Sequence, residues 1–323
     1  MAAVLHAPDD GLDAARAFDL DDDAAYLRWH DAKLAQRAPD AEALTVDVAD
    51  PAALGAAERE ALLARIARSN MALYRSPPAA HADRRLPRAL GAQLGLLRLD
   101  ANWLADDDGI SNIEVSERSD GRGGFIPYTD RAIGWHTDGY YHPSERSIHA
   151  MILHCVRPAR EGGANTLLDH ELAYIALRDA SKDHIRALMA SDAMTIPARA
   201  TGDDIARAAQ SGPVFSLDAQ GRLHMRYTAR SRSIEWKADA ATRAAVACLE
   251  ALLASDSPWI VRTRLAAGMG FVGHNVLHAR AAFADDPAQP RLLLRARFLD
   301  RVAPLPADRA TPAPAGATPW RNG

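Results

Sequence analysis

The chain has 323 residues, of which 48% are hydrophobic and 25% are charged, a composition that is ordinary for a globular protein and excludes a disordered or fibrous chain. The formal net charge is −4, so no basic excess points to a nucleic acid or an anionic membrane as partner. No apolar run reaches the roughly 18 residues of a membrane-spanning helix, and the amino terminus lacks the pattern of a signal peptide. Cys155 and Cys248 are too few for a disulfide framework, so we expect a cytoplasmic protein.

Capping residues and hydrophobic spacing predict the elements of the first part of the chain. A helix is expected to follow the acidic run Asp21–Asp23 and to end near Ala35, because these carboxylates can cap its first turn. A second helix is expected at 58–68, where apolar residues recur at helical spacing. The alternating stretches at 44–48 and 71–74 predict short strands.

The rest of the chain contains more predicted strands than helices. Residues 112–138 are Gly-rich and irregular, which predicts a loop. Helices are expected at 170–177, 181–191 and 240–254, and strands at 148–156, 214–217, 223–228, 259–265, 268–275 and 291–299. We therefore predict a mostly β domain with flanking helices (α+β) over 41–302. A helical extension at 1–40 precedes it, and a flexible Pro- and Ala-rich tail at 303–323 follows it.

The sharpest motif is Gly-Trp-His-Thr-Asp-Gly at 134–139. Side chains alternate between the two faces of an extended chain, so His136 and Asp138 project together. An imidazole and a carboxylate placed in this way can supply two of the three ligands of the facial triad of non-haem iron sites. A His-x-Asp tripeptide alone is most often a surface turn, so the interpretation depends on a third ligand.

A second imidazole and two arginines lie downstream of this motif. His278 follows a predicted strand, and His274 lies four residues before it as a rival ligand. Arg291 and Arg295 lie in the apolar stretch RLLLRARFLDR, where a buried guanidinium needs an anionic partner and matches a carboxylate in bidentate fashion. A Gly-Gly turn leads to the hydroxyl of Thr166.

In this order and spacing, the segments resemble the TauD/TfdA family of Fe(II)- and 2-oxoglutarate-dependent dioxygenases. The resemblance covers about residues 40–300 and is strongest at 134–175 and 271–300. The stretch HTDGYYHPSERSIHAMILHCVRPAREGGANTLLDHELAY is similar to the γ-butyrobetaine and trimethyllysine hydroxylase branch. The resemblance implies a double-stranded β-helix (jelly-roll) core. It also implies Fe(II) as cofactor, 2-oxoglutarate as cosubstrate, and oxidation of an aliphatic C–H of a small polar substrate, with release of succinate and CO2.

Carried over residue by residue, the resemblance implies that the iron ligands are His136, Asp138 and His278. Arg291 is expected to hold the distal carboxylate of 2-oxoglutarate, and Thr166 is expected to donate a hydrogen bond to it. The chain departs from the family pattern before the distal histidine, where Gly-His-Asn replaces Asp-Asn-Arg. This departure leaves the rival histidine four residues upstream as an alternative ligand.

The substrate side is less determined. Arg295 matches a residue that faces the substrate in sulfonate-binding members, which implies an acidic group on the substrate, yet either Arg291 or Arg295 can hold 2-oxoglutarate. Tyr140 and Tyr141 follow the metal motif and are expected to line the substrate pocket, although packing explains them equally well. The expected partners are a small-molecule substrate and O2, and the resemblance allows a homo-oligomer.

A function of another class is a cupin-like metal-binding or sensor protein without turnover. Such a protein shares the barrel and the imidazole ligands but has no need for an arginine aimed at a dicarboxylate. The pair Arg291 and Thr166 therefore favours the oxygenase. The sequence does not identify the substrate, nor whether hydroxylation or desaturation results.

Overall fold

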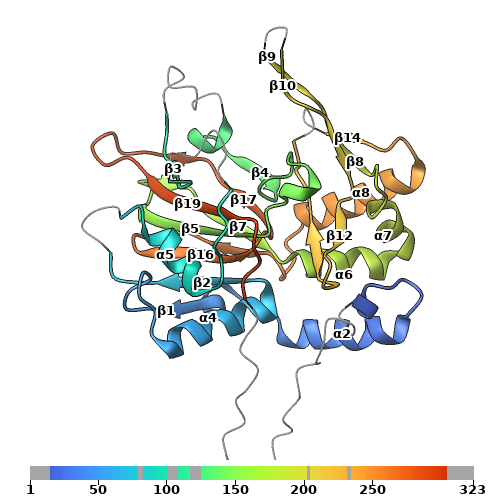
Figure 1. The fold of residues 1–323 in the computed structure, drawn as a ribbon, viewed down its shortest axis with the longest axis horizontal. Helices are drawn as coiled ribbons and strands as arrows, with labels where there is room; N and C mark the ends of the chain where they lie inside the picture. Colours follow the sequence, from blue (N-terminus) through green and yellow to red (C-terminus); the bar gives the residue numbers. More distant parts are fainter. Residues whose placement is uncertain are drawn as a thin grey trace, which may run out of the picture.

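The computed structural model describes residues 15–78, 83–100, 108–116, 125–201, 204–230 and 234–303. Two β-sheets form its centre, and helices pack around them (Figure 1). The larger sheet has the order β1-β2-β16-β5-β19-β3, with the bounds Thr45–Asp47, Met71–Arg75, Met269–His274, Ala150–Arg157, Leu292–Phe298 and Ser111–Ile113. The smaller sheet has the order β15-β7-β17-β4, with the bounds Val261–Thr263, Asn165–Leu168, Leu277–Arg280 and Ile133–His136.

Helices and short hairpins complete the described part of the chain. The helices are α2 (Asp23–Gln36), α3 (Ala41–Leu44), α4 (Ala56–Ser69), α5 (Leu86–Gln93), α6 (His170–Ala180), α7 (Lys182–Leu188) and α8 (Ala240–Ala254), with 3-10 turns η2 (Ile126–Tyr128) and η3 (Ser144–Arg146). The paired short strands are β6 (Glu161–Gly162) with β18 (Phe283–Ala284), β9 (Arg199–Thr201) with β10 (Asp204–Arg207), and β12 (Phe215–Leu217) with β13 (Leu223–Met225). A three-stranded sheet has the order β11 (Gln210–Gly212), β8 (Met194–Ile196) and β14 (Glu235–Trp236).

The larger sheet buries both of its faces. Because side chains alternate along a strand, Ile152 and Leu294 point outward and pack with Leu62 of α4 and Leu90 of α5. The inner face carries residues such as Met151, which pack against the smaller sheet in a second cluster. The space between the two sheets is therefore the interior in which a site can form.

A third apolar cluster lies beside the two sheets. Helices α6, α7 and α8 pack there with β8, β12 and β13. Tyr26 of α2 belongs to the same cluster, and Lys33 of α2 forms a buried ion pair with Asp169 at 2.6 Å. Helix α2, which was expected in an N-terminal extension, thus packs onto the body of the protein (Figure 1).

Two facing, mainly antiparallel sheets with covering helices confirm the predicted α+β fold with a jelly-roll core. The helix expected at 240–254 is α8, with Asp239 capping it through the backbone N–H of Thr242. The expected strand at 44–48 is shorter than predicted, because Leu44 ends α3 and β1 begins at Thr45. Apart from Ala303, the predicted flexible tail lies outside the described residues.

The predicted loop at 112–138 is partly wrong, since it contains β4 and most of β3. Helix α5 was not predicted; it is only eight residues long, and a proline in its first turn is more often the sign of a turn or loop. Within the described residues, no helix has the length and apolar character required to cross a membrane.

Candidate active site

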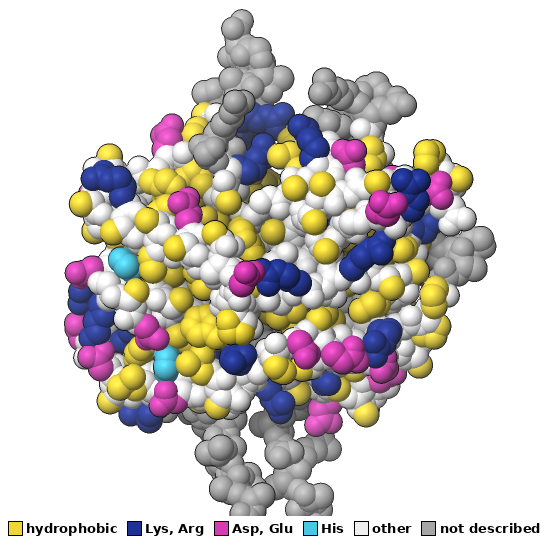
Figure 2. Space-filling view, turned by 180° about the vertical axis from the view of Figure 1, so that it is seen from behind, with side chains coloured by type: hydrophobic (Ala, Val, Ile, Leu, Met, Phe, Trp, Pro, Cys, Tyr) yellow, Lys and Arg dark blue, Asp and Glu magenta, His cyan; other side chains and the backbone are white. Residues whose placement is uncertain are grey.

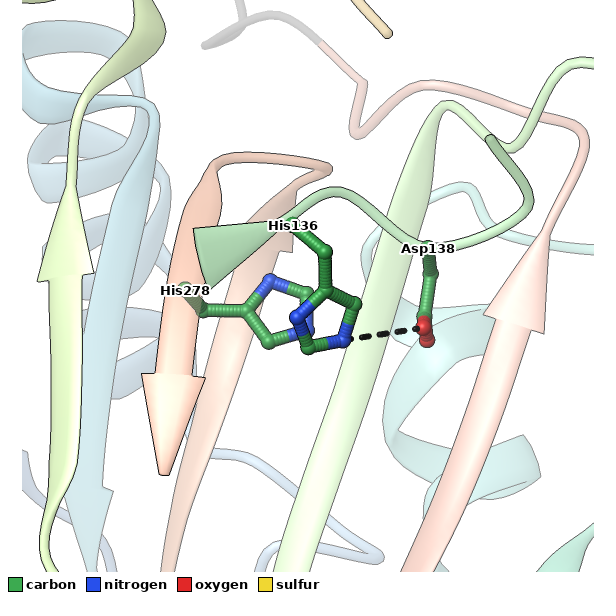
Figure 3. Close-up of side chains that lie close together, drawn as sticks. All are labelled: His136, Asp138 and His278. Carbon is green, nitrogen blue, oxygen red and sulfur yellow. Dashed lines mark ion pairs between the residues drawn. The ribbon is translucent and has the colours of Figure 1, made fainter. Parts of the chain in front are cut away.

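The hydrogen-bond register of the smaller sheet brings two histidines together. His136 ends β4 and lies directly opposite His278 of β17, so their side chains project from the same face. The two ring centroids are 4.1 Å apart. Residues that are 142 positions apart in the chain thus become neighbours (Figure 3).

Asp138 follows β4 by two residues and turns toward the same point. Its Oδ1 lies 3.9 Å from Nε2 of His136, the pair marked in Figure 3. One ligand atom from each of Asp138, His136 and His278 falls within 4.8 Å of the others. The three predicted iron ligands are therefore brought together as one group.

Backbone carbonyls fix the orientation of both imidazoles. Nδ1 of His136 lies 2.9 Å from the carbonyl oxygen of Gly134, and Nδ1 of His278 lies 2.9 Å from that of Val276. Each Nδ1–H can donate to its carbonyl, so that each Nε2 keeps a lone pair for a metal. This is the tautomer that metal binding needs.

The electrostatic environment keeps these groups in their metal-binding forms. Burial, followed by the neighbouring His278, lowers the pKa of His136 to about 3. Burial also lowers the pKa of His278, so both imidazoles are neutral near pH 7. Burial alone raises the pKa of Asp138, but Arg295 and Arg297 outweigh it and hold that pKa below its ordinary value. The set comprises two neutral imidazoles and one carboxylate.

Asn275 holds the backbone of the ligand loop and was missed in the sequence. Its Oδ1 accepts a hydrogen bond from the backbone N–H of Asp138 at 2.7 Å, and its Nδ2 donates to the carbonyl of Asp138 at 2.7 Å. Nδ2 also donates to the carbonyl of Ile148 at 2.9 Å. The asparagine of the unusual Gly-His-Asn segment therefore supports the carboxylate ligand.

The rival ligand His274 lies in a different environment. Its Nδ1 contacts Oδ1 of Asn70 at 2.7 Å, and Arg301 approaches the same nitrogen at 3.4 Å. Its side chain belongs to no group of described residues that is suited to a metal. The geometry favours His278 over His274.

Alternation along β19 directs a row of arginines toward the interior. Arg295 lies opposite Leu153 of β5 and shares its face, which is the face that lines the interior cavity. Its Nη1 lies 3.4 Å from Oδ1 of Asp138. The Nε of Arg295 is buried and has no hydrogen-bond partner among the described residues, so the guanidinium retains a donor.

Arg297 projects from the same face and was also missed. Its Nη2 forms an ion pair with Asp100 at 2.5 Å, and its Nη1 donates to the hydroxyl of Tyr141 at 3.1 Å. Arg146 forms a second ion pair with Asp100 at 2.7 Å. The alternation in RLLLRARF signals that Arg295 and Arg297 share a face, so this residue was detectable in the sequence.

Two adjoining cavities extend from the metal ligands to Arg291. The first is lined by His278 and Leu153, the second by Arg291 and Cys155, and Asn165 and Leu265 line both. Arg291 is buried, which lowers its pKa, and its Nη1 has no hydrogen-bond partner in the described part of the chain. A buried cation of this kind is suited to an anion that enters the cavity.

The position of Thr166 differs from the prediction. Leu167 lies opposite His278 and shares its inward face, whereas Thr166 lies opposite Ala279 and points the other way. Thr166 lines neither cavity, whereas its neighbour Asn165 lines both. The carboxamide of Asn165 therefore lies at the cavities, and the hydroxyl of Thr166 is on the opposite face of β7.

Tyr140 and Tyr141 are half-buried beside the ligand loop. Their rings meet edge to face with centroids 5.2 Å apart, and both pack against the helical cluster. The hydroxyl of Tyr141 reaches Arg297 on the interior face of β19. Packing thus explains Tyr140, while Tyr141 also contacts the charged side of the site.

The donor set fits a ferrous ion. Two imidazole nitrogens and one carboxylate are the ligands of a 2-His-1-carboxylate site, which leaves coordination positions for small molecules. Oδ2 of Asp138 is buried and has no hydrogen-bond partner among the described residues, so a cation there would satisfy it. Together with the cavity that leads to Arg291, the arrangement can hold a metal and a small anionic chelator.

Comparisons with known proteins agree with this geometry. Residues 31–297 match the family described as "Taurine catabolism dioxygenase TauD, TfdA family". A uridine-5'-phosphate dioxygenase from an Amycolatopsis species is 32% identical over 192 residues, 57% of this chain and 66% of that protein. A Streptomyces protein of the same name is 34% identical over 174 residues, 52% of this chain and 62% of that protein. The matches span slightly less than two thirds of these relatives.

Solved structures share the fold at low sequence identity. An asparagine oxygenase in complex with Fe(II), 2S,3S-3-hydroxyasparagine and succinate has a TM-score of 0.55 at 17% identity, covering 90% of this chain and 92% of that chain. The non-heme iron oxygenase OrfP in complex with Fe and alpha-ketoglutaric acid has a TM-score of 0.52 at 18% identity, covering 72% and 75%. Since the family match spans most of the chain, the protein belongs to the TauD/TfdA family.

Proposed function

We propose that this dioxygenase hydroxylates an aliphatic C–H of a small anionic substrate, and that a phosphate monoester of the uridine 5'-phosphate kind is the first candidate. The observation that carries the proposal is the ion pair between Arg295 and Asp138. It places a guanidinium with a free buried donor directly beside the metal ligands. In the reaction, one O2 and one 2-oxoglutarate convert C–H to C–OH, and succinate and CO2 are released.

Different residues are assigned to the metal and to 2-oxoglutarate. We assign the metal to His136, Asp138 and His278; an Fe(II) held by these residues would supply the redox chemistry that links O2 to the decarboxylation of 2-oxoglutarate. Arg291 binds the distal carboxylate of 2-oxoglutarate; in support, its Nη1 has no hydrogen-bond partner among the described residues, and its side chain lines the cavity that adjoins the one at His278. Asn165 takes the hydrogen-bonding role that the sequence suggested for its neighbour Thr166.

Charges on the substrate side favour an anion. Arg295, Arg297 and Arg146 carry three positive charges, whereas Asp138 and Asp100 carry two negative charges. The iron adds further positive charge when it is bound. A substrate with an acidic group therefore balances the interior, which agrees with the role expected for Arg295.

A quaternary ammonium substrate fits less well. Its recognition relies on aromatic faces that are free to receive a cation. Here the guanidinium of Arg207 lies 5.8 Å from the ring centroid of Tyr141, and that of Arg199 lies 4.6 Å from that of Phe125. Because arginines of the protein already lie over the rings of Phe125 and Tyr141, these rings are not free to bind the cation of a betaine substrate.

The names of the two relatives supply the candidate. Both are uridine-5'-phosphate dioxygenases, and a phosphate monoester carries an anion of the kind that the arginines require. The test measures succinate release with uridine 5'-phosphate, uridine, amino acids, sulfonates and betaines. The proposal expects stimulation by uridine 5'-phosphate and not by uridine. Stimulation by an uncharged or cationic compound alone would show that the assigned substrate class is wrong.

A further inference from the structure

Two arginines face each other at the start of the β9–β10 hairpin. Arg199 is the first residue of β9 and Arg207 is the last residue of β10, and the antiparallel register places them directly opposite each other. Directly opposed residues of an antiparallel pair project to the same face. Like charges in this position repel each other and destabilise the hairpin. The arrangement therefore carries a cost unless an anion lies between the two side chains.

The described residues do not neutralise this pair. Burial lowers the pKa of Arg207, and the nearby Arg199 lowers it further, while the neighbouring phenols of Tyr140 and Tyr141 oppose the shift. Arg207 donates to the carbonyl of Pro197 at 2.7 Å and approaches that of Tyr141 at 3.5 Å. Neither contact is an ion pair, and in the described ranges no carboxylate pairs with Arg199 or Arg207.

Aromatic contacts hold both guanidinium groups in place. Arg199 lies over Phe125 and Arg207 lies over Tyr141, at the distances given above. Stacking on a ring leaves the edge of the planar guanidinium, where the N–H donors lie, available to a ligand. The guanidinium groups of Arg199 and Arg207 lie on one face of the hairpin. Together they offer several N–H donors and two positive charges, which match the oxygens and the double negative charge of a phosphate.

Contacts connect this pair to the metal ligands. Tyr141 lies three residues after Asp138, its carbonyl is near Arg207, and its hydroxyl accepts from Arg297 on the interior face of β19. Lys and Arg side chains gather at the top of the face in Figure 2, on the end of the molecule where the hairpin projects in Figure 1. Tyr141 thus connects Arg207 to Arg297 on the charged side of the site.

We propose that Arg199 and Arg207 form an anion site that binds the phosphate of a phosphate monoester substrate. The proposal rests on the proposed function, since it assigns the terminal phosphate to the hairpin and leaves Arg295 to a group nearer the metal. The pair is then a specificity determinant. A phosphate at the hairpin holds the substrate at one end while its C–H is presented to the metal site.

The first experiment measures thermal stability with inorganic phosphate as probe. Phosphate is expected to raise the Tm of the wild-type protein, measured without metal at constant ionic strength. Arg199→Glu is the informative variant, because it converts the like-charged pair into an ion pair with Arg207. Its Tm without phosphate should rise, and the effect of phosphate should disappear. The exposed Arg243 of α8 supplies the control Arg243→Gln, which should retain the phosphate effect.

A lower Tm for Arg199→Glu together with an unchanged response to phosphate would overturn the proposal, because the arginine would then be structural. An equal response to phosphate and to chloride would do the same, since it would show only general screening. These readouts do not depend on turnover. They remain valid even if uridine 5'-phosphate proves not to be the substrate.

The second experiment measures succinate release with uridine 5'-phosphate. Arg199→Gln and Arg207→Gln should each raise the KM for this compound by about tenfold to a hundredfold, the loss expected for one charged hydrogen bond. The KM for 2-oxoglutarate should not change. An unchanged KM for an active nucleotide would overturn the hairpin site and leave the proposed function intact. Loss of the phosphate-dependent Tm shift in the variants, with no nucleotide turnover, would support the hairpin site and contradict the proposed substrate.

Discussion

Asn275 binds the peptide backbone of Asp138 on both sides, accepting from its N–H and donating to its carbonyl, each at 2.7 Å. Through these bonds a residue of the segment that carries His278 fixes the loop that carries the carboxylate. Support of this kind around a metal site typically contributes tenfold to a hundredfold to metal affinity. The relationship leads to the first prediction.

Asn275→Ala is expected to lower the affinity for Fe(II) by about tenfold to a hundredfold, because the carboxylate loop loses its support. An anaerobic metal titration of the folded protein measures this. Asn70→Gly is a matched control, since Asn70 is similarly buried and bonds Asp169 and His274 rather than a metal ligand. Glycine tolerates the positive φ of 56° at this position. Equal affinities for the two variants would show that Asn275 has no role at the metal.

The second prediction concerns the metal ligands themselves. His136→Ala, Asp138→Ala and His278→Ala should each abolish tight Fe(II) binding and 2-oxoglutarate turnover while the fold persists, because each removes one of three protein ligands. His274→Ala should retain the metal. Metal content after anaerobic loading and desalting, with circular dichroism as a fold control, measures the outcome. If His274→Ala lost the metal and His278→Ala kept it, the second histidine ligand would be His274 and not His278.

The third prediction separates the residues around 2-oxoglutarate. Arg291→Leu should raise the KM for 2-oxoglutarate steeply, since a buried carboxylate loses a charged partner worth about 2–5 kcal/mol. Asn165→Leu should cost on the order of 1 kcal/mol for one neutral hydrogen bond. Thr166→Val should leave the KM unchanged, because Thr166 points away from the cavity. If Thr166→Val raised the KM for 2-oxoglutarate more than Asn165→Leu did, Thr166 and not Asn165 would face the cosubstrate.

The fourth prediction concerns coupling. Arg295→Gln should lower the yield of hydroxylated product per succinate, because the part of the substrate nearest the metal ligands loses a charged hydrogen-bond donor while 2-oxoglutarate keeps Arg291. The measurement is the ratio of product to succinate with an active substrate. Arg262→Gln on the exposed face of β15 is the control. A large rise in the KM for 2-oxoglutarate in Arg295→Gln would instead assign the cosubstrate to Arg295.

The fifth prediction is the pH dependence of stability in the metal-free protein. Burial lowers the pKa of His154 to about 4 and is the leading cause that lowers that of His136 to about 3. The unfolded chain therefore binds more protons below its ordinary histidine pKa of about 6.5. The stability that these neutral histidines contribute is therefore present above about pH 6.5. As the pH falls from there toward the pKa values of the folded state, the free energy of unfolding decreases by about 1.4 kcal/mol per pH unit for each histidine. Urea unfolding between pH 5 and 6.5 measures the slope.

His154→Gln provides the check on this slope. Its side chain stacks on Tyr74 at a centroid distance of 5.9 Å, away from the metal ligands. The variant should show a slope that is smaller by about one proton, or about 1.4 kcal/mol per pH unit. An unchanged slope would mean that His154 is protonated in the folded state.

Two of the three proposed metal ligands were predictable because their signal is local. His136 and Asp138 are two residues apart in an extended segment, and alternation alone brings them to one face. His278 was proposed from the resemblance to a family, and the register of β17 with β4 places it in one group with the other two residues. The same alternation could have identified Arg297, since RLLLRARF repeats its arginines on one face.

Other parts of the site could not be read from the sequence. The pairing of β7 with β17 sets which side chains of β7 face inward, and it places Asn165 rather than Thr166 at the cavities. The opposition of Arg199 and Arg207 depends on a hairpin register with a bulge, which composition does not specify. The support from Asn275 depends on a contact between segments 137 residues apart.

The alternation of β19 also limits how this enzyme can change. One face of the strand carries Arg295 and Arg297, while the other packs Leu294 and Phe298 into the outer core. Inserting or deleting a single residue within the strand would exchange these faces, burying guanidinium groups in an apolar layer and turning apolar side chains toward the metal. The inward side chains of β19 can therefore be changed by point substitution, whereas a change in the length of the strand would remove the arginines from the interior.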